Sequence, residues 1–290
     1  MLDNINWAGK AAGANPYSGQ IGAENLTFVE SLLNTTPPDR LIVLCMHIPL
    51  ISANDPSDPG SNTSDRDALL ALISDRPCVS FAGHLHTTEH HYLPLPNGGQ
   101  HHHHILTALS GSWWSGPMDP LGQPMAQSCD GAPNGWHMLS VNGTDYSTRF
   151  VSAREPSQMR IMLTCDGEPN AERKSRKVAS TTIGRTDLKD TKIVINIFDG
   201  GPRTTVYACV SGCSASITKR APRHDPMTQD LFEQAGTTKK PWVQAERSSH
   251  IWQAELPADL PSGLHRLNVT AENEYGQIHH GAMIFEVRHG

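Results

Sequence analysis

Two short histidine motifs each follow an apolar segment that has the character of a buried strand. Gly83-His84-Leu85-His86 comes directly after residues 78–82, and His47-Ile48-Pro49 comes directly after residues 41–46. Side chains at the C-terminal ends of such strands build the ligand and metal sites of open α/β sheets. Histidines spaced i, i+2 can direct two imidazoles toward one small volume or toward two adjacent ions. The sequence therefore predicts a metal centre with His47, His84 and His86 as ligands.

The order and spacing of these motifs resemble the second half of the calcineurin-like metallophosphoesterase core. The resemblance continues in residues 110–114 (SGSWW) and 130–135 (DGAPNG), which look like the bacterial branch of that family that carries an extra C-terminal domain. Residues 196–200 (NIFDG) and 250–263 resemble the appended domain itself. The similarity covers essentially the whole chain.

The resemblance implies a hydrolase that cleaves phosphate esters with two divalent metal ions. It assigns His47 and His84 to the second ion and His86 to the first. Because imidazole ligands suit Mn, Fe and Zn better than Mg, we expect one of those three metals. The expected partner is a phosphorylated small molecule or another phosphoester. The attacking group is water, so neither a nucleophilic side chain nor a glycine-rich phosphate loop is required.

The motifs of the family's first half do not occur between Met1 and Gly290. The sequence contains no Asp-x-His, no Gly-Asp pair and no Gly-Asn-His. These motifs carry the bridging carboxylate and most ligands of the first ion, so the three histidines alone do not complete a dinuclear centre. We expect a truncated or split enzyme whose partner is the missing N-terminal half, and an isolated chain without activity. The alternative is a non-catalytic β-rich binding or scaffold module, or one partner of a split enzyme.

The first part of the chain, residues 1–156, is predicted to be the C-terminal half of the α/β catalytic domain. Helical spacing of leucines predicts helices over 19–33 and 65–74, between strands that end before the histidine motifs. The polar loop 52–64 is long enough to line a site. Further strands are predicted at 2–7, 91–95, 105–109, 138–141 and 146–151. The last two should form a hairpin with a type I′ turn at Asn142-Gly143.

The second part, residues 157–290, is predicted to be a small all-β sandwich of immunoglobulin-like size. Short alternating strands separated by Gly, Pro and Asp indicate this architecture. They are expected at 160–164, 192–198, 205–210, 250–255, 263–271 and 282–287. His250 and Trp252 are expected to pack within it.

The sequence holds 16 histidines, of which the run His101–His104 is the most conspicuous. We favour a solvated loop and strand edge for this run, because only alternate residues of a strand face one side. A contribution to a substrate pocket and a third metal site are the alternatives. His90 and His91 are expected on the surface of a strand.

Five residues downstream are candidates for contact with the substrate. Trp113 and Trp114 could form an aromatic wall against a sugar or nucleoside, or pack beneath a long loop. Asp119, Asp130 and Asn134 lie in turn sequences rich in Pro and Gly, and turn chemistry alone explains their presence.

Composition excludes several classes of protein. With 37% hydrophobic and 18% charged residues the chain falls in the globular range, and its net charge of −6 gives no nucleic-acid footprint. No apolar run reaches the length of a transmembrane helix, and no export signal stands at Met1, so localisation stays open: periplasmic or secreted if a signal lies in a missing N-terminal part. Of the six cysteines, Cys45 and Cys78 are expected as buried free thiols, and Cys209 and Cys213 could staple a hairpin.

Overall fold

The computed structural model describes residues 1–7, 17–165, 178, 181–234 and 236–289. They form a mixed α/β protein built mostly from strands, with few helices and several sheets, which confirms the predicted fold class. The chain divides into two compact units. The first comprises Met1–Ala108 and Trp136–Val151, and the second comprises Leu109–Gly135 and Ser152–Gly290. The predicted domain boundary after residue 156 stays a prediction.

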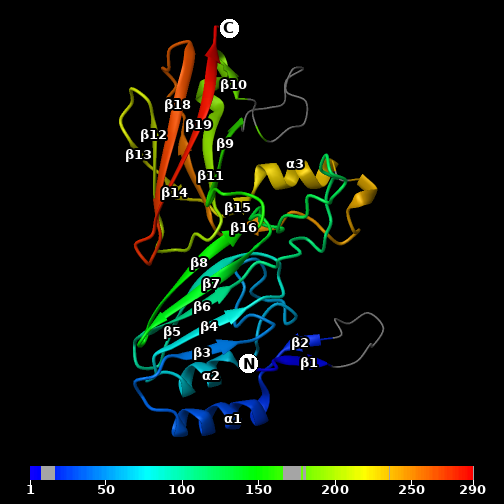
Figure 1. Cartoon of the computed structure of the whole chain (residues 1–290), viewed down its shortest axis with the longest axis vertical. Helices are drawn as coiled ribbons and strands as arrows, with labels where there is room; N and C mark the ends of the chain where they lie inside the picture. Colours follow the sequence, from blue (N-terminus) through cyan, green and yellow to red (C-terminus); the bar gives the residue numbers. More distant parts are fainter. Residues whose placement is uncertain (8–16, 166–177, 179–180, 235, 290) are drawn as a thin grey trace. The chain divides into compact units, whose positions relative to one another are not determined.

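The first unit is a four-stranded sheet with helices on one face and a hairpin on the other (Figure 1). The sheet consists of β3 (Ile42–Cys45), β4 (Cys78–Ala82), β5 (Glu89–Pro94) and β6 (Gln100–Ile105). Two separate strand pairs are β1 (Ile5–Trp7) with β2 (Tyr17–Gly19) and β7 (Gly135–Asn142) with β8 (Asp145–Ser152). The sheet order is β3-β4-β6-β5, in which β5 alone runs antiparallel to its neighbour. The helices are α1 (Gly22–Thr35) and α2 (Arg66–Leu72), close to the predicted ranges.

Apolar side chains of α1 and α2 form one core with the sheet. Val29 of α1 and Leu69 of α2 are buried together with Leu44 of β3 and Ala82 of β4. The carboxylate of Asp65 accepts hydrogen bonds from the backbone N–H groups of Ile21 and Gly22, both at 2.8 Å. A carboxylate at these unpaired N–H groups stabilises the start of α1 and ties it to the start of α2.

The predicted hairpin of β7 and β8 is confirmed, but its turn differs by one residue. The strands extend to Asn142 and resume at Asp145, so the central residues are Gly143 and Thr144. Only Gly143 has a positive φ, at 64°. A positive φ confined to the first central position belongs to a type II′ turn, whereas type I′ needs it at both.

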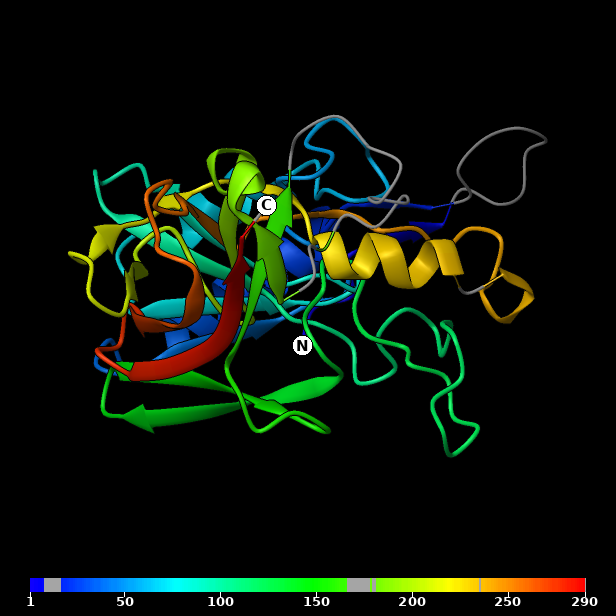
Figure 2. The ribbon, with the colours of Figure 1, turned by 90° about the horizontal axis from the view of Figure 1, so that it is seen from above.

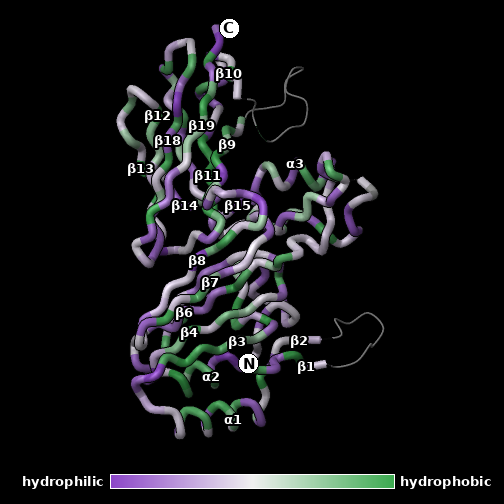
Figure 3. Tube along the Cα trace, in the orientation of Figure 1, coloured by the Kyte–Doolittle hydropathy of each residue, from purple (hydrophilic) through white to green (hydrophobic). Residues whose placement is uncertain are grey.

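The prediction for the histidine run was wrong. Residues 101–104 form the middle of β6, between β4 and β5, and all four side chains are buried, as is that of His90 on β5. Figure 3 shows this hydrophilic stretch inside the sheet. The strand predicted at 105–109 instead ends at Ile105. Hydropathy assigns histidine to the surface, but neutral imidazoles can be buried when their nitrogens are hydrogen-bonded.

One face of the run is satisfied by a serine. The N–H of Leu50 donates to Nε2 of His103 at 3.0 Å, so Nδ1 of His103 carries its proton. That Nδ1 lies 2.7 Å from Oγ of Ser80, whose hydroxyl lies 2.7 Å from Nε2 of His101. Two neutral imidazoles satisfy this chain of donors and acceptors. Burial agrees, since it lowers the pKa of His101 to about 4.

The second unit is a β-sandwich, as predicted. One sheet has the order β10-β19-β18-β12-β13 and the other β14-β17-β11-β9. Its elements are β9 (Met159–Cys165), β10 (Thr182–Gly184), η1 (Arg185–Asp190), β11 (Thr191–Ile197), β12 (Thr205–Val210), β13 (Ser216–Ile217), β14 (Lys219–Arg220), β15 (Arg223–His224), α3 (Pro226–Gln234), η2 (Gly236–Thr238), β16 (Arg247–Ser248), β17 (Ile251–Glu255), β18 (Gly263–Glu272) and β19 (Ile278–Arg288). Side chains from both sheets share one core, among them Ile195 of β11, Trp252 of β17 and Val269 of β18. Seen from above, β19 is strongly curved (Figure 2).

The structure also shows the state of the cysteines and the character of the helices. All six cysteines are free, and the thiol of Cys209 donates to the carbonyl of Cys213 rather than forming a disulfide with it. No helix in the described residues combines the length and apolar character needed to cross a membrane.

Candidate metal centre at the strand ends

His47 and His84 come together where β3 and β4 end. The two strands are parallel neighbours, so their C-terminal ends lie at the same edge of the sheet. The N–H of Gly83 donates to the carbonyl of His47 at 3.2 Å, which joins the two motifs through the backbone. Nδ1 of His84 lies 3.0 Å from Nε2 of His47, and the ring centroids are 4.7 Å apart. Two ring nitrogens at this separation can bind a single ion.

Asn4 holds the backbone of the His47 motif in place. Its side chain is fully buried and donates to the carbonyl of Ile48 at 2.6 Å and to Oγ1 of Thr63 at 2.9 Å. Its amide oxygen accepts from the N–H groups of His47 and Ile48, both at 3.2 Å. The amide group of Asn4 therefore positions the motif.

The backbone of the second motif is strained. His84 has a φ of 73° and His86 a φ of 56°, both in the left-handed region that side chains with a Cβ rarely adopt. Each such residue costs about 1–3 kcal/mol, which the surrounding structure must offset. Residues held this way cluster at functional sites, where the strain aims a side chain.

The surroundings of His84 keep its imidazole neutral. Burial is the largest cause that lowers its pKa, to about 4, and the neighbouring His47 lowers it further. A hydrogen bond with the backbone of Gly60 and the charge of Asp58 act in the opposite direction. Both residues belong to the loop 52–64, so this loop lines the site as predicted. Metal ions bind the neutral form of histidine, which His84 therefore presents at pH 7.

His86 is near this pair but is not part of the same contact. Its charge contributes to the lowered pKa of His84. Within the part of the chain that the structure describes, no convergent group of three ligating side chains includes His47, His84 or His86. The structure thus brings His47 and His84 together, and the convergence of all three stays a prediction. Sequence patterns gave no signal for Tyr17, whose ring meets that of His84 edge-on at 5.5 Å.

The two candidate aromatic residues belong to the second unit. Trp113 and Trp114 both have positive φ values, 54° and 58°, and Trp114 is 60% exposed. Gly111, just before them, has a φ of 51° and lies against the backbone of Ala126 and the side chain of Asn134. The backbone therefore turns tightly at these residues, and Trp114 is presented to solvent.

The three polar candidates make structural contacts within the same unit. Asp119 accepts hydrogen bonds from the N–H groups of Leu121 and Gln123, both at 2.9 Å. Asn134 donates to the carbonyl of Leu109 at 2.9 Å. Asp130 is fully buried. These contacts account for the three residues as turn formers, and their role toward a substrate stays a prediction.

Asp130 is the anchor of a buried network that sequence patterns did not reveal. Its Oδ2 lies 2.8 Å from Nε2 of His250, which is also fully buried. Nδ1 of His250 lies 2.7 Å from Oδ1 of Asn196, and Nδ2 of Asn196 donates to Asp225 at 2.7 Å. The network joins the loop 109–135 to β11 and to the residues that immediately precede β17 and α3. His250 and Trp252 are buried in the sandwich, as predicted.

A protein-family model matches most of the chain. Residues 103–279 match a family model described as the C terminal of calcineurin-like phosphoesterase. The matched segment covers well over half of the chain and includes Trp113, Trp114, Asp119, Asp130 and Asn134. It begins after the two histidine motifs. No curated protein matches the chain.

Proposed function

Because the chain belongs to the calcineurin-like phosphoesterases, we propose that it acts in the metal-dependent hydrolysis of phosphate esters, with His47 and His84 holding one divalent ion and His86 the other. The observation that carries this proposal is the 3.0 Å approach of two imidazole nitrogens at the ends of adjacent parallel strands. Mn, Fe and Zn fit this donor set, since imidazole is a good ligand for all three.

The contribution of this chain is to hold two neutral imidazoles in a fixed geometry. Asn4 fixes the turn that carries His47, and the strained backbone of residues 83–86 aims His84. The hydrogen bond of His84 with the backbone of Gly60 is the kind of contact that orients a ligating imidazole. The bound ions would supply an activated water and neutralise the charge that develops on the phosphoryl oxygens.

We propose further that the remaining ligands come from a polypeptide with the first-half motifs, Asp-x-His, Gly-Asp and Gly-Asn-His. Three histidines leave each ion short of the four or more donors that hold it in a hydrolytic site. The bridging carboxylate stabilises the two ions together, so its absence removes most of the stabilisation of the transition state. The isolated chain is then inactive, and activity requires complementation.

The experiment compares hydrolysis of an aryl phosphate and a bis-aryl phosphate diester by the chain alone and by the chain co-expressed with the coding sequence immediately upstream. With added Mn²⁺, we expect the chain alone to match a variant with His47, His84 and His86 all changed to Ala. We expect the complemented protein to turn over substrate, and His84→Ala to lower its kcat/KM by roughly 100-fold or more. His280→Ala, an exposed position in the second unit, is the matched control and should not change it.

Two results would contradict the proposal. Turnover by the chain alone that is lost on His47→Ala would mean that ligands within the chain complete the site, with Asp3 the first to examine. Turnover by the complemented protein that survives all three alanine changes would remove these histidines from the metal centre.

A further inference from the structure

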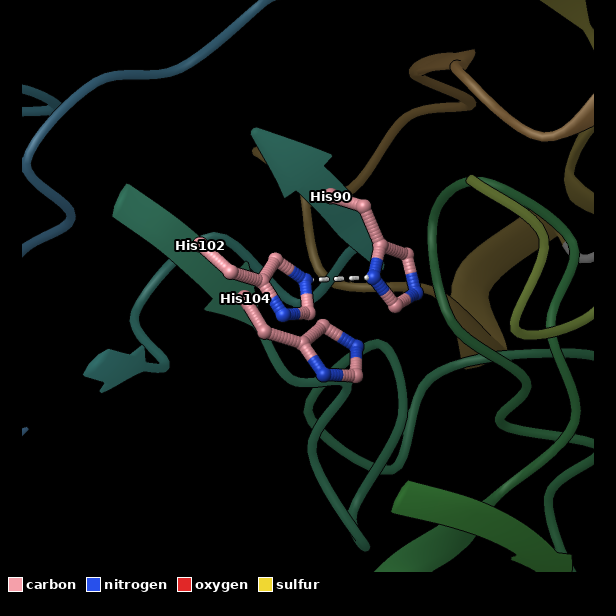
Figure 4. A group of neighbouring side chains, drawn as sticks. All are labelled: His90, His102 and His104. Carbon is pink, nitrogen blue, oxygen red and sulfur yellow. Dashed lines mark hydrogen bonds between the residues drawn. The ribbon is translucent and has the colours of Figure 1, made fainter. Parts of the chain in front are cut away.

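Three imidazoles converge in the interior of the first unit, on the face of the sheet that the β7–β8 hairpin covers. His90 on β5 lies directly opposite His104 on β6 in the antiparallel register. His102 lies two residues before His104, so strand alternation places it on the same face. One ring nitrogen from each of the three lies within 4.8 Å of the others, and all three side chains are buried (Figure 4).

The three rings are in direct contact with one another. Nδ1 of His90 lies 2.9 Å from Nε2 of His102. The rings of His90 and His104 stack with centroids 3.8 Å apart. On its far side, Nδ1 of His102 lies 2.7 Å from the hydroxyl of Tyr146 on β8. A partner of this kind on the second ring nitrogen fixes the orientation of a metal-ligating histidine.

The electrostatic setting favours neutral rings. Burial lowers the pKa of His102 far below its ordinary value, and the neighbouring His90 and His104 lower it further. Neutral imidazole is the form that binds a metal ion. The proton shared by His90 and His102 would move to another ring nitrogen when the ion binds, so the rings need a change of tautomer and no net loss of charge. His137 on β7 provides another imidazole nearby, with its ring centroid 4.9 Å from that of His104 and its plane nearly perpendicular.

We propose that His90, His102 and His104 form a binding site for one transition-metal ion of the class that prefers imidazole, with Zn²⁺ as the reference ion. This site uses none of the residues His47, His84 and His86. An ion held by β5 and β6 ties these two strands together, because the free energy of binding at such a site adds to the free energy of folding. Its role is structural, since all three central ligands are shielded from solvent.

The first test measures binding by a variant with His47, His84 and His86 all changed to Ala, so that ions held by the strand-end motifs do not contribute. After loading with Zn²⁺ and dialysis, we expect about one ion per chain by elemental analysis. A 100-fold excess of Zn²⁺ over Kd should raise Tm by roughly 5–10 °C. Co²⁺ in its place should give the visible absorption of a low-symmetry site with nitrogen ligands.

Variants then locate the ion. In the same background Tyr146→Phe, which removes only the hydroxyl beside His102, should weaken Zn²⁺ binding by about 10-fold. His104→Gln should abolish it, whereas the exposed His280→Gln should leave it unchanged. Binding that is unaffected by both Tyr146→Phe and His104→Gln would overturn the proposal.

A crystal of the Zn²⁺-loaded protein decides the matter without any change at the three histidines. Anomalous scattering at the zinc edge should give a peak about 2.0–2.1 Å from one nitrogen of each of them. A map with no peak there, or with peaks only at surface histidines, would show a hydrogen-bonded core of histidines without an ion. The hydrolytic proposal is untouched by either result, because its test measures turnover at different residues.

Discussion

The side-chain amide of Asn4 pairs with both backbone groups of Ile48. Nδ2 donates to the carbonyl at 2.6 Å, and the N–H donates to Oδ1 at 3.2 Å. Forty-four residues separate the two, so a local motif at the end of β3 depends on a residue near the start of the chain. The position of His47, one residue earlier, is thus set by a contact with Asn4, a residue outside the His47-Ile48-Pro49 motif.

Replacement of Asn4 should therefore destabilise the first unit. Asn4→Ala leaves buried backbone groups of residues 47 and 48 without a partner, which costs about 2–3 kcal/mol. Hydrogen–deuterium exchange should show faster exchange at β3 and at residues 47–50, together with a lower Tm. Asn34→Ala, exposed on α1, is the matched control and should stay within about 0.5 kcal/mol. Equal protection in both variants would show that the pairing contributes nothing.

The buried pair of His250 and Asp130 should be far more sensitive than a surface pair. Removal of one partner by His250→Ala leaves a fully buried carboxylate without its nearest donor, at a cost of about 3–5 kcal/mol. Glu286→Gln, which breaks an exposed pair with Arg288 at 3.0 Å, should cost less than about 1 kcal/mol. Calorimetric unfolding of the second unit measures both. A double-mutant cycle with Asp130→Ala that gives no coupling would contradict the role of the network.

Glycine at position 111 should be irreplaceable, whereas Gly122 in the same loop should not. A Cβ on Gly111 would overlap the carbonyl of Ala126 and lie 2.8 Å from Nδ2 of Asn134. Gly111→Ala should cost about 3 kcal/mol or more, because backbone atoms cannot yield as a flexible side chain can. Gly122 has a φ of 73° but open space around its Cα, so Gly122→Ala should cost only about 1 kcal/mol. Similar Tm values for the two variants would be the contrary result.

The thiol of Cys129 should be inert in the folded protein. Burial raises its pKa to about 12, and the charges of Asp130 and Glu246 raise it further. The thiolate is the reactive form, so a thiol reagent at pH 8 should label the half-buried Cys209 well before Cys129, as mapped by mass spectrometry. The pKa in the folded state lies above the unfolded value of 9.0, so the thiol stays protonated to a higher pH in the folded state than in the unfolded state. The raised pKa means that the buried thiol contributes to the free energy of unfolding as long as it is protonated. That contribution is fully present below pH 9 and is lost as the pH rises toward 12. Labelling of Cys129 at the rate of Cys209 would refute the assignment.

The parts of the fold that follow from local patterns were predictable. Helical spacing found α1 and α2, two apolar runs found β3 and β4, and turn residues found the β7–β8 hairpin. Helix α3 was missed because its residues are polar, although Asp225 followed by Pro226 is a sequence signal for a helix start. Asp225 does accept a hydrogen bond from the N–H of Thr228 at 2.8 Å.

The contacts that organise the sites were beyond sequence patterns because they join distant residues. The motif spacing found His47 and His84, but the support from Asn4 depends on how the first residues fold back onto β3. The run at 101–104 was misjudged for a related reason. Its burial depends on Ser80, Leu50 and Tyr146, each supplied by another element, and without them four polar side chains belong in solvent.

The uniformity of the buried run has a consequence for how β6 finds its place. A strand normally specifies its alignment by alternating side chains, and a shift by one residue exposes the mismatch. In β6 a shift by one position still leaves histidines at three of the four sites, so the run itself distinguishes poorly between alignments. The register is therefore specified by the two ends of β6, where Ile105 is fully buried beside Ala82 and Gln100 is exposed. A polar residue at position 105 would thus allow β6 to pair with its neighbours in a register shifted by one residue. All four histidines would still be present, and the shifted pairing would slow folding as a kinetic trap.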